Sequence, residues 1–146
     1  TPAAQLQPRE RELRYENIRS ARAEEGVLRL MLLEPGLFQN AGALEPEQFS
    51  SPLLGRVYGM LRRRWQEGRS TQLSALTGEL TADEMSHLVH VLDQPESLAH
   101  SQKALADYIE IIATEYAKRS GGTQADPLMA AREKFREKKA YNGQNT

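Results

Sequence analysis

The chain has 146 residues, a formal net charge of −1, 39% hydrophobic residues and no cysteine. This length suits one domain with an appendage, and the lack of cysteine excludes disulfides and thiolate metal sites. The near-neutral charge argues against a dedicated nucleic-acid-binding protein, so no direct nucleic-acid contact is expected. The sequence has no apolar run of about 18 residues, which a membrane span would need, and no visible signal peptide. We therefore expect a cytoplasmic protein with no membrane partner. Because the chain starts at Thr1 and not at methionine, we expect a fragment of a larger protein.

Residues 1–19 are predicted to form a linker. They combine proline, glutamine and alternating charge with few apolar residues, a composition typical of a linker that becomes helical near its end. From Ser20 onward, apolar residues are so dense that nearly all sides of the predicted helix are apolar, which is typical of a helix in the middle of a bundle. Pro35 and Gly36 should end this helix.

A second helix is predicted from Ser51 to Gly68. Ser51 can cap it, and Pro52 stands at the first helical position, where its missing N–H has no cost. A short turn before it, Glu45–Phe49, should bury Phe49. The apolar stripe of the helix has helical spacing and consists of Leu54, Val57, Tyr58, Leu61 and Trp65.

A short helix over residues 71–80 and a longer one capped by Thr81 should follow. Glu84 stands three residues after Thr81, as a capping box requires. The expected buried stripe of the longer helix is Met85, Leu88, Val89 and Leu92.

The C-terminal region, residues 101–141, is predicted to be a helical hairpin. One helix runs from about Ser97 or Ser101 to Ser120, Gly121 and Gly122 break it, and Asp126 caps a second, weakly apolar helix. Residues 142–146 should be a disordered tail. No strand pattern is found, so the predicted fold is all-α: a bundle of about six helices over residues 20–100, followed by the hairpin.

The sequence contains no motif of a phosphate-binding loop and no nucleophile elbow. His87 and His90 lie three residues apart, but the expected buried stripe leaves both near solvent and no third ligand has helical spacing. The acidic pairs Glu24–Glu25 and Asp83–Glu84 are explained by the first turns of helices. We therefore expect no catalytic residue, metal or cofactor in this fragment.

Two features have alternative interpretations. Arg62, Arg63 and Arg64, with Arg56 and Arg69 nearby, form either a site for phosphate or an acidic partner or simply a solvated helix face. The stripe Tyr108, Ile109, Ile112 and Tyr116 is either bundle core or a surface offered to another protein.

An ordered series of segments resembles a known family. These segments are Arg22–Gly36, a phenylalanine turn over Leu44–Phe49, a helix from Leu54 to Gly68, and Tyr108–Ile112. The series is similar to two related domains: the C-terminal helicase-binding domain of bacterial DNA primase and the N-terminal domain of the bacterial replicative helicase. The similarity covers roughly residues 20–141.

The resemblance implies a non-catalytic docking domain, monomeric, whose hairpin binds the N-terminal domains of the replicative helicase hexamer at the replication fork. Single-stranded DNA-binding protein is a further implied partner. The primase is preferred as the parent because Tyr141–Thr146 has the character of a chain end. The zinc, the magnesium and the primer-synthesising active site of a primase would then lie upstream of this fragment.

Two other hypotheses stay open: the N-terminal domain of the helicase itself, and a nucleic-acid-binding helical module that uses the arginine cluster. For the main hypothesis, the candidate partner-binding residues are Tyr108, Ile112, Tyr116, Leu128, Met129, Arg132, Phe135 and Arg136.

Overall fold

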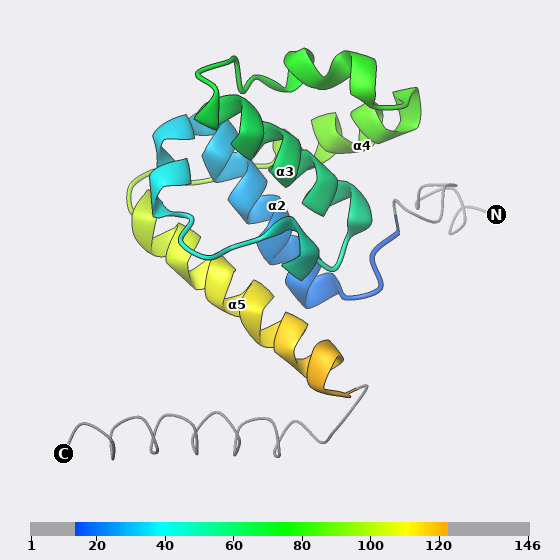
Figure 1. Ribbon diagram of the computed structural model, residues 1–146, viewed down its shortest axis with the longest axis vertical. Coiled ribbons are helices and arrows are strands. Elements are labelled where there is room, and N and C mark those ends of the chain that lie inside the picture. Colours follow the sequence, from blue (N-terminus) through cyan, green and yellow to red (C-terminus); the bar gives the residue numbers. More distant parts are fainter. Residues whose placement is uncertain (1–13, 123–146) are drawn as a thin grey trace. The chain divides into compact units, whose positions relative to one another are not determined.

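The computed structural model describes residues 14–122 (Figure 1). Within this range four α-helices and three 3-10 helices follow one another without a strand, which confirms the predicted all-α fold. The chain divides into two compact units, residues 1–113 and 114–146. The elements are α2 (Ile18–Leu33), η2 (Pro35–Asn40), η3 (Pro46–Gln48), α3 (Pro52–Gln66), η4 (Leu73–Glu79), α4 (Ala82–Leu92) and α5 (Ser101–Gly122).

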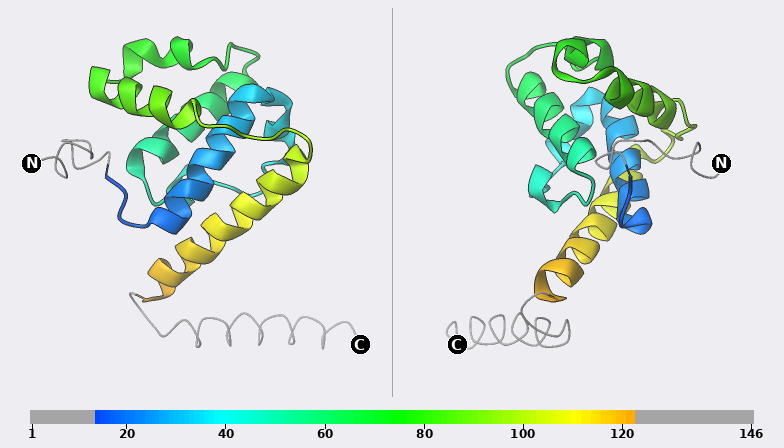
Figure 2. Two further views of the ribbon diagram at one scale, coloured as in Figure 1. Left: turned by 180° about the vertical axis from the view of Figure 1, so that it is seen from behind. Right: turned by 90° about the vertical axis from the view of Figure 1, so that its right-hand side faces the viewer.

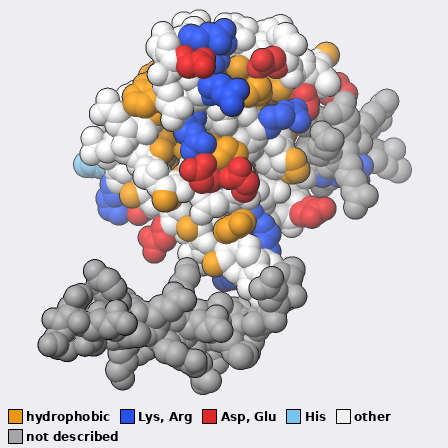
Figure 3. All heavy atoms as spheres, in the orientation of Figure 1, with side chains coloured by type: hydrophobic (Ala, Val, Ile, Leu, Met, Phe, Trp, Pro, Cys, Tyr) orange, Lys and Arg blue, Asp and Glu red, His pale blue; other side chains and the backbone are white. Residues whose placement is uncertain are grey.

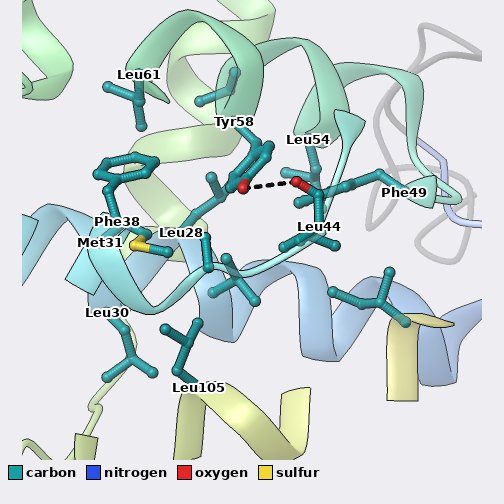
Figure 4. Close-up of a cluster of buried hydrophobic side chains, with 14 of the residues drawn as sticks. Leu28, Leu30, Met31, Phe38, Leu44, Phe49, Leu54, Tyr58, Leu61 and Leu105 are labelled. Carbon is teal, nitrogen blue, oxygen red and sulfur yellow. Dashed lines mark hydrogen bonds between the residues drawn. The ribbon is translucent and has the colours of Figure 1, made fainter. Parts of the chain in front are cut away.

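Helix α2 is the central helix of the first unit, as its apolar density predicts. The side chain of Asn17 caps it by accepting a hydrogen bond from the Ser20 amide at 3.0 Å, and the helix ends at Leu33, before Pro35. It begins within the segment predicted to become helical at the end of a linker. Helix α3 packs along one side of α2, and residues 101–113 of α5 pack along another (Figures 2 and 4).

Helix α3 forms as its sequence signals predict. The Ser51 hydroxyl accepts from the Leu54 amide at 3.2 Å, and Gly68 ends the helical segment with a φ of +70°, which favours glycine. The Tyr58 hydroxyl donates to the Leu44 carbonyl at 3.0 Å, so this buried polar group has a partner (Figure 4). The predicted stripe is confirmed, since Leu54, Val57, Tyr58 and Leu61 are fully buried and Trp65 is partly buried against the same core.

Helix α4 has the predicted capping box but a different buried face. The Thr81 hydroxyl accepts from the Glu84 amide at 3.1 Å, and Glu84 Oε1 accepts from the Thr81 amide at 2.8 Å. The prediction that Val89 is buried is wrong, because its side chain is 54% exposed. Glu84, Leu88 and Val91 define the buried face instead. Since Glu84 closes the cap and pairs with Arg56, a polar residue stands where the sequence pattern requires an apolar one.

The segment predicted as a helix over residues 71–80 is the 3-10 helix η4, which buries only Leu76. Helix α5 begins at Ser101, one of the two predicted starts, and continues to Gly122. In the first unit, Leu105 and Ile112 of α5 are fully buried in the common core. In the described part of the second unit, Lys118 Nζ lies 3.0 Å from Glu115 Oε2. Across residues 14–122, helix length and apolar content fall short of what a membrane span requires.

Candidate functional site

Three of the eight predicted partner-binding residues lie in the described part of the chain. Ile112 is fully buried in the core and so fits the packing of α5 better than direct contact with a partner. In the second unit, the Arg119 guanidinium lies 5.1 Å from the centre of the Tyr116 ring. Leu128, Met129, Arg132, Phe135 and Arg136 lie outside the described residues, as does the second helix of the predicted hairpin.

Tyr108 fixes α5 against a bare stretch of α2 backbone. A Cβ placed on Gly26 would lie 2.4 Å from two ring carbons of Tyr108, so only glycine leaves room for the ring. The Tyr108 hydroxyl donates to Glu96 Oε2 at 2.9 Å. Burial, assisted by the Glu96 carboxylate, raises the pKa of Tyr108. The residue is therefore a neutral hydrogen-bond donor that sets the position of α5 on α2.

Arg29 extends this contact into a network between α2 and the segment that joins α4 to α5. Its Nε donates to Glu96 Oε1 at 3.1 Å, and its Nη1 donates to the Val91 carbonyl at 3.1 Å. The side chains of Arg29 and Glu96 are 12% and 10% exposed, so each needs the other to compensate for lost hydration. Ser101 Oγ donates to Glu34 Oε2 at 2.8 Å at the start of α5. The entry into α5 is thus held by several specific polar contacts.

Tyr15 attaches the segment before α2 to helix α4. Its hydroxyl donates to Glu25 Oε2 at 2.6 Å and lies 2.8 Å from His87 Nε2. Because a phenol has one proton, the second contact must be donated by His87. The prediction that His87 lies near solvent is wrong, because the same rotation of the α4 face that exposes Val89 turns His87 inward. Burial lowers the pKa of His87, although the Glu25 carboxylate opposes this effect.

Within the described part of the chain, His87 and His90 belong to no metal-binding cluster. Among residues 14–122, no group of three histidine, aspartate or glutamate side chains is placed to hold a metal ion.

Glu24 is a buried carboxylate that joins α2 to the start of α3. Its Oε2 accepts from the Ser50 amide at 2.8 Å and from the Ser50 and Ser20 hydroxyls at 2.6 Å each, and its Oε1 accepts from the Ser51 amide at 3.0 Å. The explanation of Glu24 by a helix first turn is wrong, since α2 already begins at Ile18. Glu24 and Ser50 are 26 positions apart in the sequence, so helical spacing could not predict that they form a hydrogen bond.

The arginine cluster of α3 lines a groove on the surface. Arg62 donates to the Leu44 carbonyl at 3.1 Å and lies 2.9 Å from Glu45, whose hydrogen bond raises the pKa of Arg62. Arg56 pairs with Glu84. Figure 3 shows Lys and Arg side chains gathered over the region that α3 occupies in Figure 1. The groove is lined by Pro46, Arg56, Gly59, Met60, Arg62, Arg63, Arg64, Gln66, Glu67, Arg69 and Glu79.

Large apolar side chains are exposed elsewhere on the first unit. They are Ile18, Leu33, Val89 and Leu98, each more than 40% exposed. Leu33 follows Arg29 by one turn of α2, so it belongs to the side of α2 that faces the segment between α4 and α5. Single exposed apolar residues are common on protein surfaces, and these four carry no assignment by themselves.

Comparison with known proteins gives one family. The family described as the DnaB-like helicase N-terminal domain matches residues 16–114, more than half of the chain. No curated protein and no solved structure is significantly similar to the chain. The matched range ends one residue after the first compact unit, so it covers α2, α3, α4 and the first half of α5.

Proposed function

Because the chain belongs to the family of DnaB-like helicase N-terminal domains, we propose that it is a non-catalytic docking domain that binds the replicative DNA helicase. The parent protein in this proposal is a DNA primase, and docking couples primer synthesis to the replication fork. The observation that carries the proposal is the family match over residues 16–114, which include all of α2, α3 and α4. The fold that the match covers is helicase-associated.

The choice of a primase as the parent has a more limited basis. The family match ends at residue 114, whereas six of the eight predicted partner-binding residues lie beyond it. A segment outside the shared fold is a suitable place for a function that distinguishes a primase from a helicase. The first unit then acts as the scaffold, because Leu105, Tyr108 and Ile112 hold the start of α5 to the bundle.

Binding of the chain to the replicative helicase tests the docking role. We expect the full chain to bind the helicase hexamer in isothermal titration calorimetry, and a chain shortened to residues 1–122 to bind at least tenfold more weakly, about 1.4 kcal/mol. The cut must fall after α5, because removing residues from 101 onward would also remove Leu105 and Ile112 from the core. A chain shortened to residues 1–141 is the matched control and should bind normally. Undiminished binding by residues 1–122 would show that the C-terminal segment does not supply the contact.

The second candidate is the N-terminal domain of the replicative helicase itself. The observation that favours it is the printed description of the matched family, which names that domain. Light scattering separates the two candidates: the helicase domain should self-associate into rings, whereas a primase docking domain should stay monomeric and bind the helicase as a separate partner.

A further inference from the structure

Folding collects the basic residues of the middle of the chain in one place. Between Arg29 and Lys103 the sequence holds nine acidic residues but only five basic ones, which are Arg56, Arg62, Arg63, Arg64 and Arg69. All five line the single groove along α3 described above, together with only two of the nine acidic residues, Glu67 and Glu79. Three of these arginines are paired with glutamates: Arg56 with Glu84, Arg62 with Glu45 and Arg69 with Glu67. The positive charge of the groove that is not offset by an ion pair therefore rests on Arg63 and Arg64.

The arginines of the groove have different amounts of free hydrogen-bonding capacity. Arg56 is held by Glu84 and Arg62 by Glu45, which fixes the positions of two lining side chains. Arg64 donates only its Nε, to the Ser70 carbonyl, so its terminal nitrogens stay available. The Arg63 side chain is exposed and makes no polar contact with the described residues. The groove thus combines fixed cations with guanidinium groups that can still bind an anion in a bidentate manner.

We propose that this groove binds the phosphate backbone of a nucleic acid. Arg56 and Arg63 lie two helical turns apart, about 10 Å, which corresponds to roughly three nucleotides of one strand. No aromatic side chain lines the groove, so bases have no stacking platform and the contacts are to phosphates without reading sequence.

An acidic protein segment is the competing ligand for the same charge. Peptide-binding grooves usually supply pockets for apolar anchor residues. Here the apolar part of the lining is limited to Pro46, Met60 and the bare backbone at Gly59. The lining therefore favours a ligand recognised by charge and by planar hydrogen bonding. This inference does not depend on helicase docking, which involves other residues.

Fluorescence anisotropy with the full chain tests the proposal. The probes are a fluorescein-labelled 20-nucleotide oligothymidylate and a duplex of the same length, at about 50 mM and 200 mM salt. We expect Arg63→Gln/Arg69→Gln to weaken binding about tenfold at 50 mM salt, and to reduce the slope of log affinity against log salt by about 1.4 for the single strand. These two arginines are chosen because Arg63 makes no polar contact with the described residues, and because the pairing of Arg69 with Glu67, at 3.4 Å, is exposed to solvent and easily exchanged for a phosphate.

Matched variants decide where the nucleic acid binds. Arg22→Gln/Lys103→Gln removes the same charge from exposed positions outside the groove and should leave the affinity within twofold. An equal loss with this control would mean that only net charge matters, and would overturn the proposal. A loss of affinity that occurs only in Arg132→Gln/Arg136→Gln would also overturn the proposal, because it would place binding in the C-terminal segment. Thermal melting by circular dichroism shows whether each variant is folded.

A gain of affinity provides a test that does not depend on loss. Glu79 is exposed, lines the groove and makes no polar contact with the described residues, so Glu79→Gln should tighten oligonucleotide binding about threefold. Unchanged or weaker binding would contradict the proposal, as would absence of any binding by the unmodified chain at 50 mM salt. A glutamate-rich peptide that displaces the oligonucleotide at a lower concentration than unlabelled oligonucleotide does would reassign the groove to an acidic protein partner.

Discussion

Helices α3 and α5 both pack on α2, but they are held by different kinds of contact. Helix α3 buries a continuous apolar stripe, and four of its side chains are fully inaccessible to solvent. The first half of α5 contributes only two fully buried apolar side chains, Leu105 and Ile112. Between them, Tyr108 fits over the bare backbone of Gly26 and bonds to Glu96. One helix is held by apolar area and the other by a few specific contacts.

The difference has a consequence for function. In a helix held by a large apolar area many side chains share the attachment, whereas in a helix held by a few contacts one substitution removes a large share of it. Along the sequence, α5 precedes the segment proposed to bind the helicase, so that segment follows the helix with fewer contacts.

The largest expected effect is the loss of apolar area under α3. We expect Leu61→Ala to lower the free energy of unfolding by about 2–5 kcal/mol, because Leu61 is fully buried and its removal leaves a cavity. Urea unfolding followed by the fluorescence of the single tryptophan, Trp65, measures this loss. Leu33→Ala, at a side chain that is 57% exposed, is the control and should change stability by no more than about 0.5 kcal/mol. Similar losses in the two variants would contradict the area-based account of α3.

The next effect concerns the polar contact at the start of α3. We expect Glu24→Gln to cost about 1.5–3 kcal/mol, because an amide nitrogen takes the place of one carboxylate oxygen and cannot accept the serine hydrogen bonds that this oxygen receives. The same urea unfolding measures the cost. Glu47→Gln, at an exposed glutamate, is the matched control and should be nearly neutral. A neutral Glu24→Gln would show that apolar packing alone positions α3.

Glu24 also shows where sequence reasoning ends. The caps at Ser51 and Thr81 and the stripe of α3 were predictable because each depends on residues within a few positions of one another. The bonds from Glu24 to Ser50 and Ser51 join residues 26 and 27 positions apart, and a buried carboxylate looks in the sequence like any charged residue on a helix.

The face of α4 was mispredicted for a related reason. Glu84 is buried through its cap and its pairing with Arg56, so the true face is centred on a charged residue, which a search for apolar spacing passes over. The packing of the Tyr108 ring on Gly26 could not be predicted either, since only the folded arrangement of α5 on α2 brings the two residues together. For the arginine cluster, the sequence located all five residues, Arg56 and Arg69 included, but not the groove that they line.

A substitution at Gly26 should separate the two kinds of attachment. We expect Gly26→Ala to cost about 1–3 kcal/mol, because the new Cβ would overlap the Tyr108 ring while the Glu96 bond restrains that ring. In hydrogen exchange, amides of residues 101–113 should lose protection while those of α3 keep theirs. Gly26→Ala/Tyr108→Ala relieves the overlap, so its cost should be less than the sum of the single changes. Uniform loss of protection in α3 and α5 would mean that the helices are not independently held.

The smallest effect should appear at α4, which joins α2 through the Tyr15–His87 contact. The pKa of His87 is lowered in the folded protein, so below about pH 6.5 the unfolded chain binds the proton more strongly. The stability that this residue contributes is therefore complete above that pH and declines as the pH falls toward the lower, folded value.

His87→Gln tests this pH dependence, since glutamine keeps an N–H donor near Tyr15 but does not titrate. Urea unfolding at about pH 7.5 and 5.5 should show a smaller loss of stability in the variant than in the unmodified chain. The carboxylates are common to both chains and cancel in this difference. His90→Gln, at an exposed position on the same helix, should behave like the unmodified chain. If His87→Gln has the same pH dependence as well, then the protonation of His87 does not affect the attachment of α4, which would depend on its buried face and on the Arg29–Val91 hydrogen bond.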